Sequence, residues 1–397
     1  MRTEWDMTMS NKTDNGFMKR LVLGSVVAGA AALWAMGPRS AFERKQRGVR
    51  VVPDVFYAHR GLHDAGSGLT EQYAAGSGEY VALARRMALR AGYGTADHVG
   101  PIAPENSMAA FAAACEAGYG IELDIQLTAD GQVVVVHDGD LLRVAGDGRA
   151  IADLTYDELS RIALFPAPAK PGDAAVPPVE TAGAGNAQTA LHGDGGVSVA
   201  NGANGVNGTE DIAENIRGRS VTAKGAMLNG SKAPQGYYQH VPLFADVLRM
   251  VHGRVPIIVE YKFCDYSWDD RHIELMKKGA ALLDRYQGAY VVESFHPMAM
   301  EWYAKNRPEV CRGQLAEDAA LAQSGIKDWA AGKLLGNWMS RPDFVAYDWH
   351  GGNSAQLRLV KAMGVTAVSW TVRSHDELDA CSGWFNRHIF ESFVPQR

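Results

Sequence analysis

The stretch Gly120-Ile-Glu-Leu-Asp-Ile-Gln-Leu-Thr-Ala-Asp-Gly-Gln-Val-Val-Val-Val-His-Asp138 predicts two β-strands joined by a tight turn. Asp130-Gly131 stands between two apolar runs, which is a strong hairpin signal because glycine accepts a positive φ without a Cβ clash. With these two residues at the centre of the turn, position 124 pairs with position 137. The hairpin therefore folds His137 back toward the first strand.

Two carboxylates lie on that first strand, two residues apart. Successive side chains of a strand point to opposite faces, so Glu122 and Asp124 share one face and Leu123 and Ile125 share the other. Two carboxylates on an apolar strand cost desolvation energy unless a positive group neutralises them. A hard divalent cation bound through oxygen is one candidate. A strand with one solvated face also carries such pairs, so the interpretation depends on the rest of the chain.

The composition is that of a globular protein. Of the 397 residues, 47% are hydrophobic and 21% are charged, and α/β barrels reach this length as a single domain. The net charge of -6 argues against a general nucleic-acid-binding protein. The four cysteines do not have the spacing of zinc ligands, which fits either a reducing compartment or a fold that needs no disulfides; they are Cys115, Cys264, Cys311 and Cys381.

An uncharged run, residues 21–37, follows Lys19-Arg20. Its length is near the lower limit for crossing the hydrocarbon core of a membrane. The segment after it, residues 38–53, is basic and by the positive-inside rule stays in the cytoplasm. We therefore expect a single-pass N-terminal transmembrane helix that leaves the main domain in the cytoplasm. The alternative is export after cleavage of a signal peptide, since small residues occur within the run.

Four segments are expected along the chain: a polar segment 1–20, the membrane anchor 21–37, a basic juxtamembrane linker 38–53 and one folded domain 54–397. Two stretches of the domain have biased composition. Residues 63–101 contain Gly and Ala clusters with one helical pattern from Glu79 to Ala91, and residues 166–236 are rich in Gly, Ala and Asn. Such low-complexity segments bury too little apolar area to offset their conformational entropy. Both are expected to be long, flexible insertions.

Short apolar, β-branched runs recur along the domain and alternate with amphipathic helical patterns. Eight of them are predicted as parallel strands: Val55–His59, Tyr119–Ile125, Val255–Lys262, Tyr290–Phe295, Cys311–Leu315, Phe344–Asp348, Thr366–Val372 and His388–Ser392. The run Gln132–Val136 follows its predecessor too closely for a crossover, so it is excluded. Eight βα units predict a (β/α)8 TIM barrel, an α/β fold, with a β-hairpin after the second strand.

The barrel also predicts where chemistry lies, because functional residues of this fold sit at the carboxyl ends of the strands. Polar or aromatic residues close several predicted strands: His59 and Arg60 on the first, Glu122 and Asp124 on the second, Glu260 and Lys262 on the third, and Trp370 on the seventh. Polar residues far apart in the sequence are thus predicted to lie together at the same end of the barrel.

This set of residues suits a hydrolytic reaction. Glu122, Asp124 and Glu260 supply oxygen ligands for one divalent cation, Mg²⁺ or Ca²⁺. His59 and His137 can act as general acid and base near neutral pH. A cation with two imidazoles fits hydrolysis of a phosphate diester, in which one histidine activates the nucleophile and the other protonates the leaving alcohol.

Two basic residues extend the same chemistry. Arg60 and Lys262 bring fixed positive charge, and a guanidinium can grip a phosphate through its planar fork. Purely structural interpretations stay open for some of the set. Lys262 could form a structural ion pair with Glu260. Glu105 could lie in the first turn of a helix and interact favourably with the helix dipole. Trp370 could belong to the hydrophobic core.

A series of short motifs accompanies these residues, in this order: Ala58-His-Arg-Gly61, Ala103-Pro-Glu-Asn-Ser107, Gly120-Ile-Glu-Leu-Asp124, Thr128-Ala-Asp-Gly131, Val136-His-Asp138, Leu154-Thr-Tyr156, Val241-Pro-Leu-Phe244, Val259-Glu-Tyr-Lys262, Glu293-Ser-Phe295 and Trp370-Thr-Val372. In these motifs the chain resembles the glycerophosphodiester phosphodiesterase family over about residues 54–394, except for the two insertions. The resemblance implies a (β/α)8 barrel, a divalent cation, and cleavage of glycerophosphodiesters to glycerol 3-phosphate and an alcohol.

The resemblance also implies roles at matching positions: catalysis by His59 and His137, metal binding by Glu122, Asp124 and Glu260, and phosphate or substrate binding by Arg60, Lys262, Glu105 and Trp370. The chain departs from the family pattern in three places. The segment between His-Arg-Gly and Pro-Glu-Asn is long, Arg373 follows Trp-Thr-Val where many members have Asn, and the last strand reads Ile389-Phe-Glu-Ser-Phe rather than Gly-Ile-Ile-Thr-Asp. No predicted metal ligand or histidine is missing.

Two other functions remain open at this point. A lysophospholipase D-like enzyme would apply the same chemistry to membrane lipids, and a membrane anchor would favour it. A non-catalytic barrel that only binds its ligand is the second, although the complete set of histidines and carboxylates argues against it. The expected partners are a small glycerophosphodiester or lysophospholipid substrate and, through the N-terminal helix, a membrane.

Overall fold

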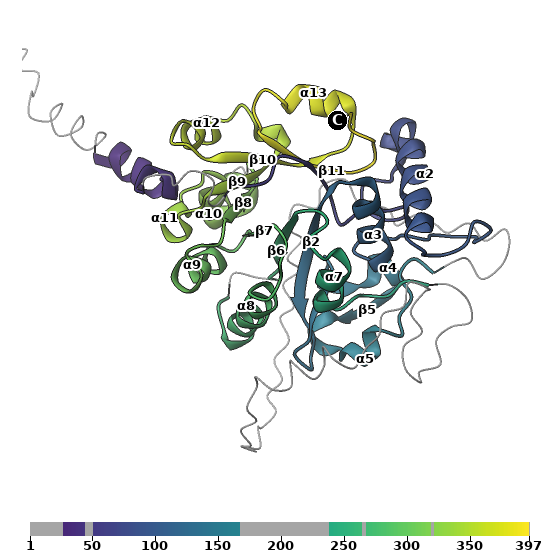
Figure 1. Cartoon of the computed structure of the whole chain (residues 1–397). Helices are drawn as coiled ribbons and strands as arrows, with labels where there is room; N and C mark the ends of the chain where they lie inside the picture. Colours follow the sequence, from purple (N-terminus) through teal and green to yellow (C-terminus); the bar gives the residue numbers. More distant parts are fainter. Residues whose placement is uncertain (1–26, 44–50, 167–237, 264–266, 319–320, 397) are drawn as a thin grey trace, which may run out of the picture.

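The computed structural model describes residues 27–43, 51–166, 238–263, 267–318 and 321–396. Its main sheet runs in the order β1-β11-β10-β9-β8-β7-β6-β2-β3, and β1 also pairs with β2. Without the antiparallel β3, eight parallel strands close into a barrel with helices around it (Figure 1). The strands are β1 Phe56–Ala58, β2 Gly120–Leu127, β3 Val133–Val135, β6 Ile257–Tyr261, β7 Tyr290–Ser294, β8 Arg312–Ala316, β9 Phe344–Asp348, β10 Thr366–Val372 and β11 Arg387–Phe390. The predicted TIM barrel is confirmed.

Helices follow the strands as a TIM barrel requires. They are α3 Met108–Ala117, α7 Phe244–Val251, α8 Asp270–Leu283, α9 Pro297–Asn306, α10 Leu321–Gly332, α11 Asn337–Ser340, α12 Ala355–Ala362 and α13 His375–Cys381. Local sequence sets their limits. The Ser107 hydroxyl accepts the backbone N–H of Ala110 at the start of α3, and Gly118 ends that helix in the left-handed conformation (φ 74°).

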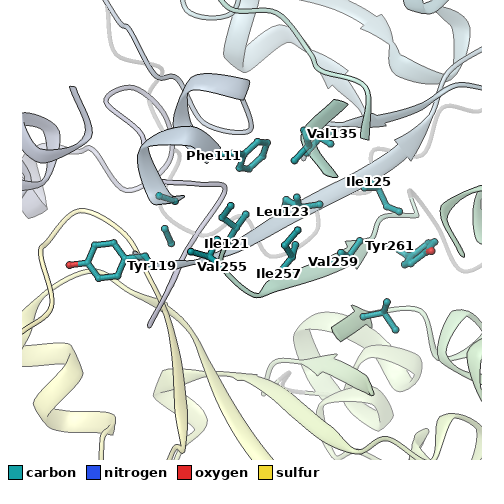
Figure 2. Packing of buried hydrophobic residues seen from close by; sticks show 14 of the residues in the cluster. Phe111, Tyr119, Ile121, Leu123, Ile125, Val135, Val255, Ile257, Val259 and Tyr261 are labelled. Atoms are coloured by element: carbon teal, nitrogen blue, oxygen red, sulfur yellow. The ribbon is translucent and has the colours of Figure 1, made fainter. Parts of the chain in front are cut away.

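Strand β2 shows how the sequence pattern positions the site. Ile121, Leu123 and Ile125 lie on its outer face, near Phe111 of α3 and Val135 of β3 (Figure 2). The alternate residues on β2 therefore point to the barrel interior, as predicted from the period of two. Because that interior is closed by neighbouring strands, the polar side chains on this face are buried.

The hairpin register differs from the prediction by one residue. The loop between β2 and β3 comprises residues 128–132 and not a two-residue turn. It is closed locally, because the Thr128 hydroxyl accepts a backbone N–H from its far end (2.8 Å). The carbonyl of Asp124 consequently accepts the N–H of Val136 (2.9 Å), and the predicted pairing of position 124 with His137 is wrong. The chain leaves the ladder at this point, so tertiary contacts direct the His137 ring.

The first predicted insertion, residues 63–101, differs from the expected flexible segment. It contains a short 3-10 turn, η2 (Glu71–Tyr73), and the helix α2 (Ala74–Arg90), which packs along α3. Tyr80, Ala84 and Ala88 of α2 are fully buried. The alanines that look like low complexity in the sequence thus form a face that packs closely on the barrel. The second predicted insertion, 166–236, lies almost entirely outside the described residues.

A small layer after the hairpin was not predicted. It consists of β4 (Asp140–Leu141), α4 (Leu142–Ala145), β5 (Asp147–Ala150), η3 (Ile151–Asp153) and α5 (Tyr156–Leu159). The layer has its own apolar cluster beneath β3, which includes Val134, Leu141 and Leu159. Its elements are too short to show a clear sequence period, which explains why pattern alone missed them.

No helix within the described ranges is long and apolar enough to cross a membrane. The predicted anchor, 21–37, lies partly outside those ranges, and residues 27–36 of it form a helix. The described part of the chain therefore does not support the predicted transmembrane helix. The residues that follow, up to Phe42, pack against the barrel.

Candidate active site

Three carboxylates from two neighbouring strands meet inside the barrel. Glu122 and Asp124 come from β2 and Glu260 from β6, and Asp124 and Glu260 are direct partners in the strand register. One potential ligand oxygen from each lies within 4.8 Å of the other two. The three residues are only 1–7% exposed. The sequence-predicted ligand set is thus brought together in one buried cluster.

The three carboxylates repel one another, so a nearby positive charge would stabilise their ionised forms. Burial, and then repulsion from the neighbouring carboxylates, raises the pKa of Glu122 well above its ordinary value. Burial also raises the pKa of Glu260 to about 7, despite the Lys262 ammonium 3.1 Å away. Asp124 behaves oppositely: burial raises its pKa, but His137, Lys262 and Arg60 outweigh burial and lower it. A donor set made only of carboxylate oxygens fits a hard divalent cation such as Mg²⁺ or Ca²⁺.

His59 follows β1 and is held by a carboxylate that directly follows β11, the last strand of the barrel. Its Nδ1 lies 2.6 Å from Oε2 of Glu391. Glu391 also accepts from Nε of Arg373 (2.6 Å) and from the Ser67 hydroxyl (2.7 Å). These contacts fix the imidazole plane and leave Nε2 as the ring nitrogen available for proton transfer. Arg373 and Glu391 are two of the positions at which the sequence departs from the family pattern.

His137 is held in a similar way. Its Nδ1 lies 2.7 Å from Oδ1 of Asp138, and the other carboxylate oxygen of Asp138 accepts from Nε of Arg143 (2.7 Å). Arg143 also donates to both carboxylate oxygens of Glu105 (2.5 and 3.0 Å). Sequence reasoning missed Arg143, because α4, which carries it, belongs to the layer without a clear pattern.

Both imidazoles favour the neutral form. Burial lowers the pKa of His59, against the opposing effect of Glu391. Burial, Arg60 and Lys262 together lower the pKa of His137 to about 4. A bound anion reverses part of this effect, because negative charge beside an imidazole favours its protonated form.

Arg60 connects the histidine side of the site to the carboxylates. Its backbone N–H donates to Glu122 (3.0 Å), and its guanidinium lies 2.8 Å from Glu105 and 3.8 Å from Asp124. The amide of Asn106 donates to Asp124 (2.9 Å). Arg60 and Asn106 both have positive φ (55° and 52°), and such strain in non-glycine residues often accompanies functional sites.

Glu105 lies among donors: Arg60, Arg143 and the Ser67 N–H (2.6 Å). Burial would raise its pKa, but the two guanidinium groups lower the pKa well below its ordinary value. The predicted substrate-binding residue thus orients the two arginines beside the site. Asn106, adjacent to it in the Pro-Glu-Asn motif, was not predicted.

Two further side chains of the barrel strands, Glu293 and Trp370, belong to the description of the site. Glu293 of β7 is the register partner of Glu260 and fully buried, and one of its oxygens has no hydrogen-bond partner among the described residues. Burial and the nearby carboxylates raise its pKa well above the ordinary value. Trp370 of β10 is partly exposed and meets Phe295 edge-to-face, with ring centroids 5.5 Å apart.

Comparisons with known proteins identify the family of the chain. Residues 96–386 match the model of the glycerophosphoryl diester phosphodiesterase family. A glycerophosphodiester phosphodiesterase of Bacillus altitudinis is 49% identical over 59 residues, 15% of this chain and 24% of that protein. One from Caldanaerobacter subterraneus is 45% identical over 60 residues, again 15% of this chain and 25% of that protein. These alignments span only about a quarter of the relatives' length.

Solved structures of similar proteins include a glycerophosphodiester phosphodiesterase from Thermotoga maritima, with a TM-score of 0.45 and 15% identity over 86% of this chain and 95% of that one. Another is an Oleispira antarctica phosphodiesterase in complex with the product sn-glycerol-3-phosphate, with a TM-score of 0.47 and 13% identity over 85% of this chain and 93% of that one. The family match spans most of the chain and contains its predicted metal ligands, so this protein belongs to the glycerophosphoryl diester phosphodiesterase family.

Proposed function

We propose that this protein is a divalent-cation-dependent phosphodiesterase that hydrolyses glycerophosphodiesters to glycerol 3-phosphate and an alcohol. One observation carries the proposal: two imidazoles, each held through Nδ1 by a carboxylate that an arginine holds in turn, lie at the mouth of a barrel that buries three further carboxylates. The names of the sequence relatives support the same reaction.

Glu122, Asp124 and Glu260 would hold the cation, since their oxygens converge and their charges repel without it. A bound Mg²⁺ or Ca²⁺ would supply Lewis-acid stabilisation of negative charge on the phosphoryl oxygens. Lys262 lies beside the same carboxylates, 3.6 Å from Asp124, and adds a fixed positive charge that can face a phosphate.

The protein's own residues then bind the diester and move protons. Arg60 and Lys262 attract the phosphate. One imidazole takes a proton through Nε2 from the water that attacks phosphorus, and the other gives a proton to the alcohol oxygen as its bond to phosphorus breaks. His59 and His137 enter this cycle with lowered pKa values, so the acid among them gains its proton as the diester anion binds.

The test is release of glycerol 3-phosphate from glycerophosphocholine and glycerophosphoethanolamine by the full chain, with and without a chelator. We expect activity that is lost on chelation and restored by Mg²⁺ or Ca²⁺. His59→Ala and His137→Ala should each lower kcat by about 10²- to 10⁴-fold, whereas Arg149→Ala on the exposed β5 should not. A folded, metal-supplied chain with no activity on either diester would refute the proposal and direct attention to lysophospholipids or to a binding role.

The location of the protein is a further part of the proposal. The basic residues that follow the apolar run 21–37 favour attachment to a membrane with the barrel in the cytoplasm. Export after signal cleavage is the alternative. Protease protection of the full chain in intact cells distinguishes the two, since a cytoplasmic barrel is cleaved only after lysis.

A further inference from the structure

The described N-terminal helix has an unusual surface. Residues 27–36 contain no charged or polar side chain, yet Val27, Leu33 and Trp34 are 61, 45 and 54% exposed. Only Met36, at its end, is buried. The helix stands away from the barrel beyond α11, at the purple end of the chain (Figure 1). An α-helix that is apolar on all sides belongs in an apolar environment, either a protein core or a lipid bilayer.

A collar of aromatic and cationic side chains surrounds the base of this helix. Trp34 stacks on Trp338 of α11, with centroids 6.1 Å apart. The guanidinium of Arg341 lies over the rings of both Trp34 (4.8 Å) and Phe42 (4.2 Å). Trp338 and Phe42 are themselves exposed. Tryptophan and arginine at the end of an apolar helix are typical of the boundary between hydrocarbon and lipid headgroups.

The base of the helix is fixed to one end of the barrel. Arg39 is buried, donates to the carbonyl of Pro308 (2.9 Å) and pairs with Asp343 (3.4 Å). The Ser40 hydroxyl donates to the carbonyl of Met363 (2.8 Å). These three partners precede β8, β9 and β10, respectively. The helix is therefore attached where strands begin, whereas the carboxylates and histidines lie where strands end.

We infer that residues 27–36 are embedded in a lipid bilayer and that the barrel docks with the amino ends of β8–β10 toward the membrane, so that its catalytic mouth opens away from it. The helix is about 15 Å long at 1.5 Å per residue, which is sufficient to enter one leaflet. Lipid is favoured over a second copy or another protein because the collar combines Trp with Arg, and because residues 38–53 are basic and complement anionic headgroups.

The orientation has a consequence for substrates, which rests on the proposed diesterase function. A mouth that faces away from its own membrane receives water-soluble diesters from solution, and lysophospholipids in that membrane cannot reach it. The structure therefore favours soluble glycerophosphodiesters over the lysophospholipase D alternative.

The test places an environment-sensitive fluorophore on single cysteines of the full chain, in a background without native cysteines, reconstituted into vesicles that contain phosphatidylcholine and phosphatidylglycerol. Phe42→Cys and Trp338→Cys report the collar, and Leu142→Cys reports the catalytic end, where its neighbour Arg143 contacts Glu105. We expect lipids with a quencher near the headgroup to quench both collar probes by at least about twofold more than the Leu142 probe.

A matched pair of substitutions tests whether lipid covers the exposed surface of the helix 27–36. Leu33→Asp should reduce co-flotation with these vesicles by about 10- to 100-fold, whereas Leu142→Asp, at another exposed leucine, should not. Quenching of the Leu142 probe above the collar probes would overturn the orientation. Failure to float, with concentration-dependent association in buffer, would instead identify a second copy as the occupant. Both readouts are independent of activity, so they remain decisive even if the diester assay fails.

Discussion

At the scale of single residues, both histidines of the site share one arrangement: Nδ1 meets a carboxylate, and an arginine holds that carboxylate from the other side. For His59 the carboxylate is Glu391 and the arginine is Arg373. Burial alone would raise the pKa of Glu391, but His59 and Arg373 lower it well below the ordinary value. The carboxylate thus stays ionised and can stabilise the imidazolium that forms during proton transfer.

We predict that Glu391→Gln lowers kcat by about 10- to 100-fold with KM changed less than about threefold, because the change affects proton transfer rather than substrate binding. Steady-state kinetics on glycerophosphocholine measures both constants. Glu301→Gln, on the surface of α9, is the matched control and should leave them unchanged. A raised KM with normal kcat would mean that Glu391 acts on the substrate instead of on His59.

The carboxylate cluster gives a prediction that needs no activity assay. In the chelated wild-type chain, Mg²⁺ or Ca²⁺ at about 100 times its Kd should stabilise the fold by about 2.7 kcal/mol. Glu122→Gln removes one ligand and one source of repulsion. Its Tm in chelator should equal or exceed that of the wild type, and the cation-induced rise should largely disappear. Thermal unfolding with and without cation measures both; a full rise in the variant would exclude Glu122 as a ligand.

At the scale of elements, the insertion before Pro-Glu-Asn, residues 63–101, contributes side chains that contact residues of the candidate site. Ser67 is buried, its N–H donates to Glu105 and its hydroxyl donates to Glu391. The insertion thereby connects Glu391, which contacts His59, with Glu105, which contacts the arginine on the His137 side of the site. Its helix α2 packs along α3 and holds this connection in place.

We expect Ser67→Ala to lower kcat about two- to tenfold, because Glu391 keeps its contacts with His59 and Arg373, so that only part of the about 1.5–3 kcal/mol of one hydrogen bond to a charged group affects proton transfer. Loss of the same hydrogen bond should lower Tm by a few degrees. The comparison is Ser77→Ala, whose hydroxyl is exposed and bonds only within α2. Kinetics and thermal unfolding of the two variants form the measurement. Equal kinetics in both would show that the insertion does not act on Glu391.

The elements also show where sequence patterns suffice. The predicted limits of Phe344–Asp348 and Thr366–Val372 agree with β9 and β10, because strands buried on both faces appear in the sequence as nearly continuous hydrophobic runs. The hairpin register was off by one, since the Asp-Gly pair lies within a five-residue loop that the Thr128 side chain closes, and not in a two-residue turn. Helix α2 begins at Ala74, earlier than the predicted Glu79, and its residues before Tyr80 are mostly exposed, so no apolar period marks that start in the sequence.

At the scale of the whole molecule, the site makes stability depend on pH and cation together. Glu260 has a folded-state pKa of about 7 against an ordinary 4.5. Without cation, its contribution is fully present below about pH 4.5 and is lost as the pH rises through 7. The depressed pKa values of Glu105 and Glu391 act in the opposite sense: their contribution is present above about pH 4.5 and is lost as the pH falls further.

Histidines with lowered pKa values, among them His59 and His137, make stability rise with pH up to about 6.5. The chelated chain should therefore become less stable between pH 6.5 and pH 8, and saturating Mg²⁺ or Ca²⁺ should remove or reverse that trend by binding the ionised carboxylates. Urea midpoints at four pH values, with and without cation, provide the measurement. Parallel curves under the two conditions would contradict a cation site at these carboxylates.

The sequence alone determined the barrel, the two histidines and the three convergent carboxylates, because strand period and βα order act locally and fix which residues end each strand on which face. The contacts that hold those residues required the tertiary structure. Glu391 lies 332 positions from His59, and no local pattern can join them. Arg143 likewise gains its role only when an irregular layer folds against Glu105. The direction of the barrel mouth relative to the N-terminal helix was also set by tertiary packing, because it depends on which loops Arg39 meets.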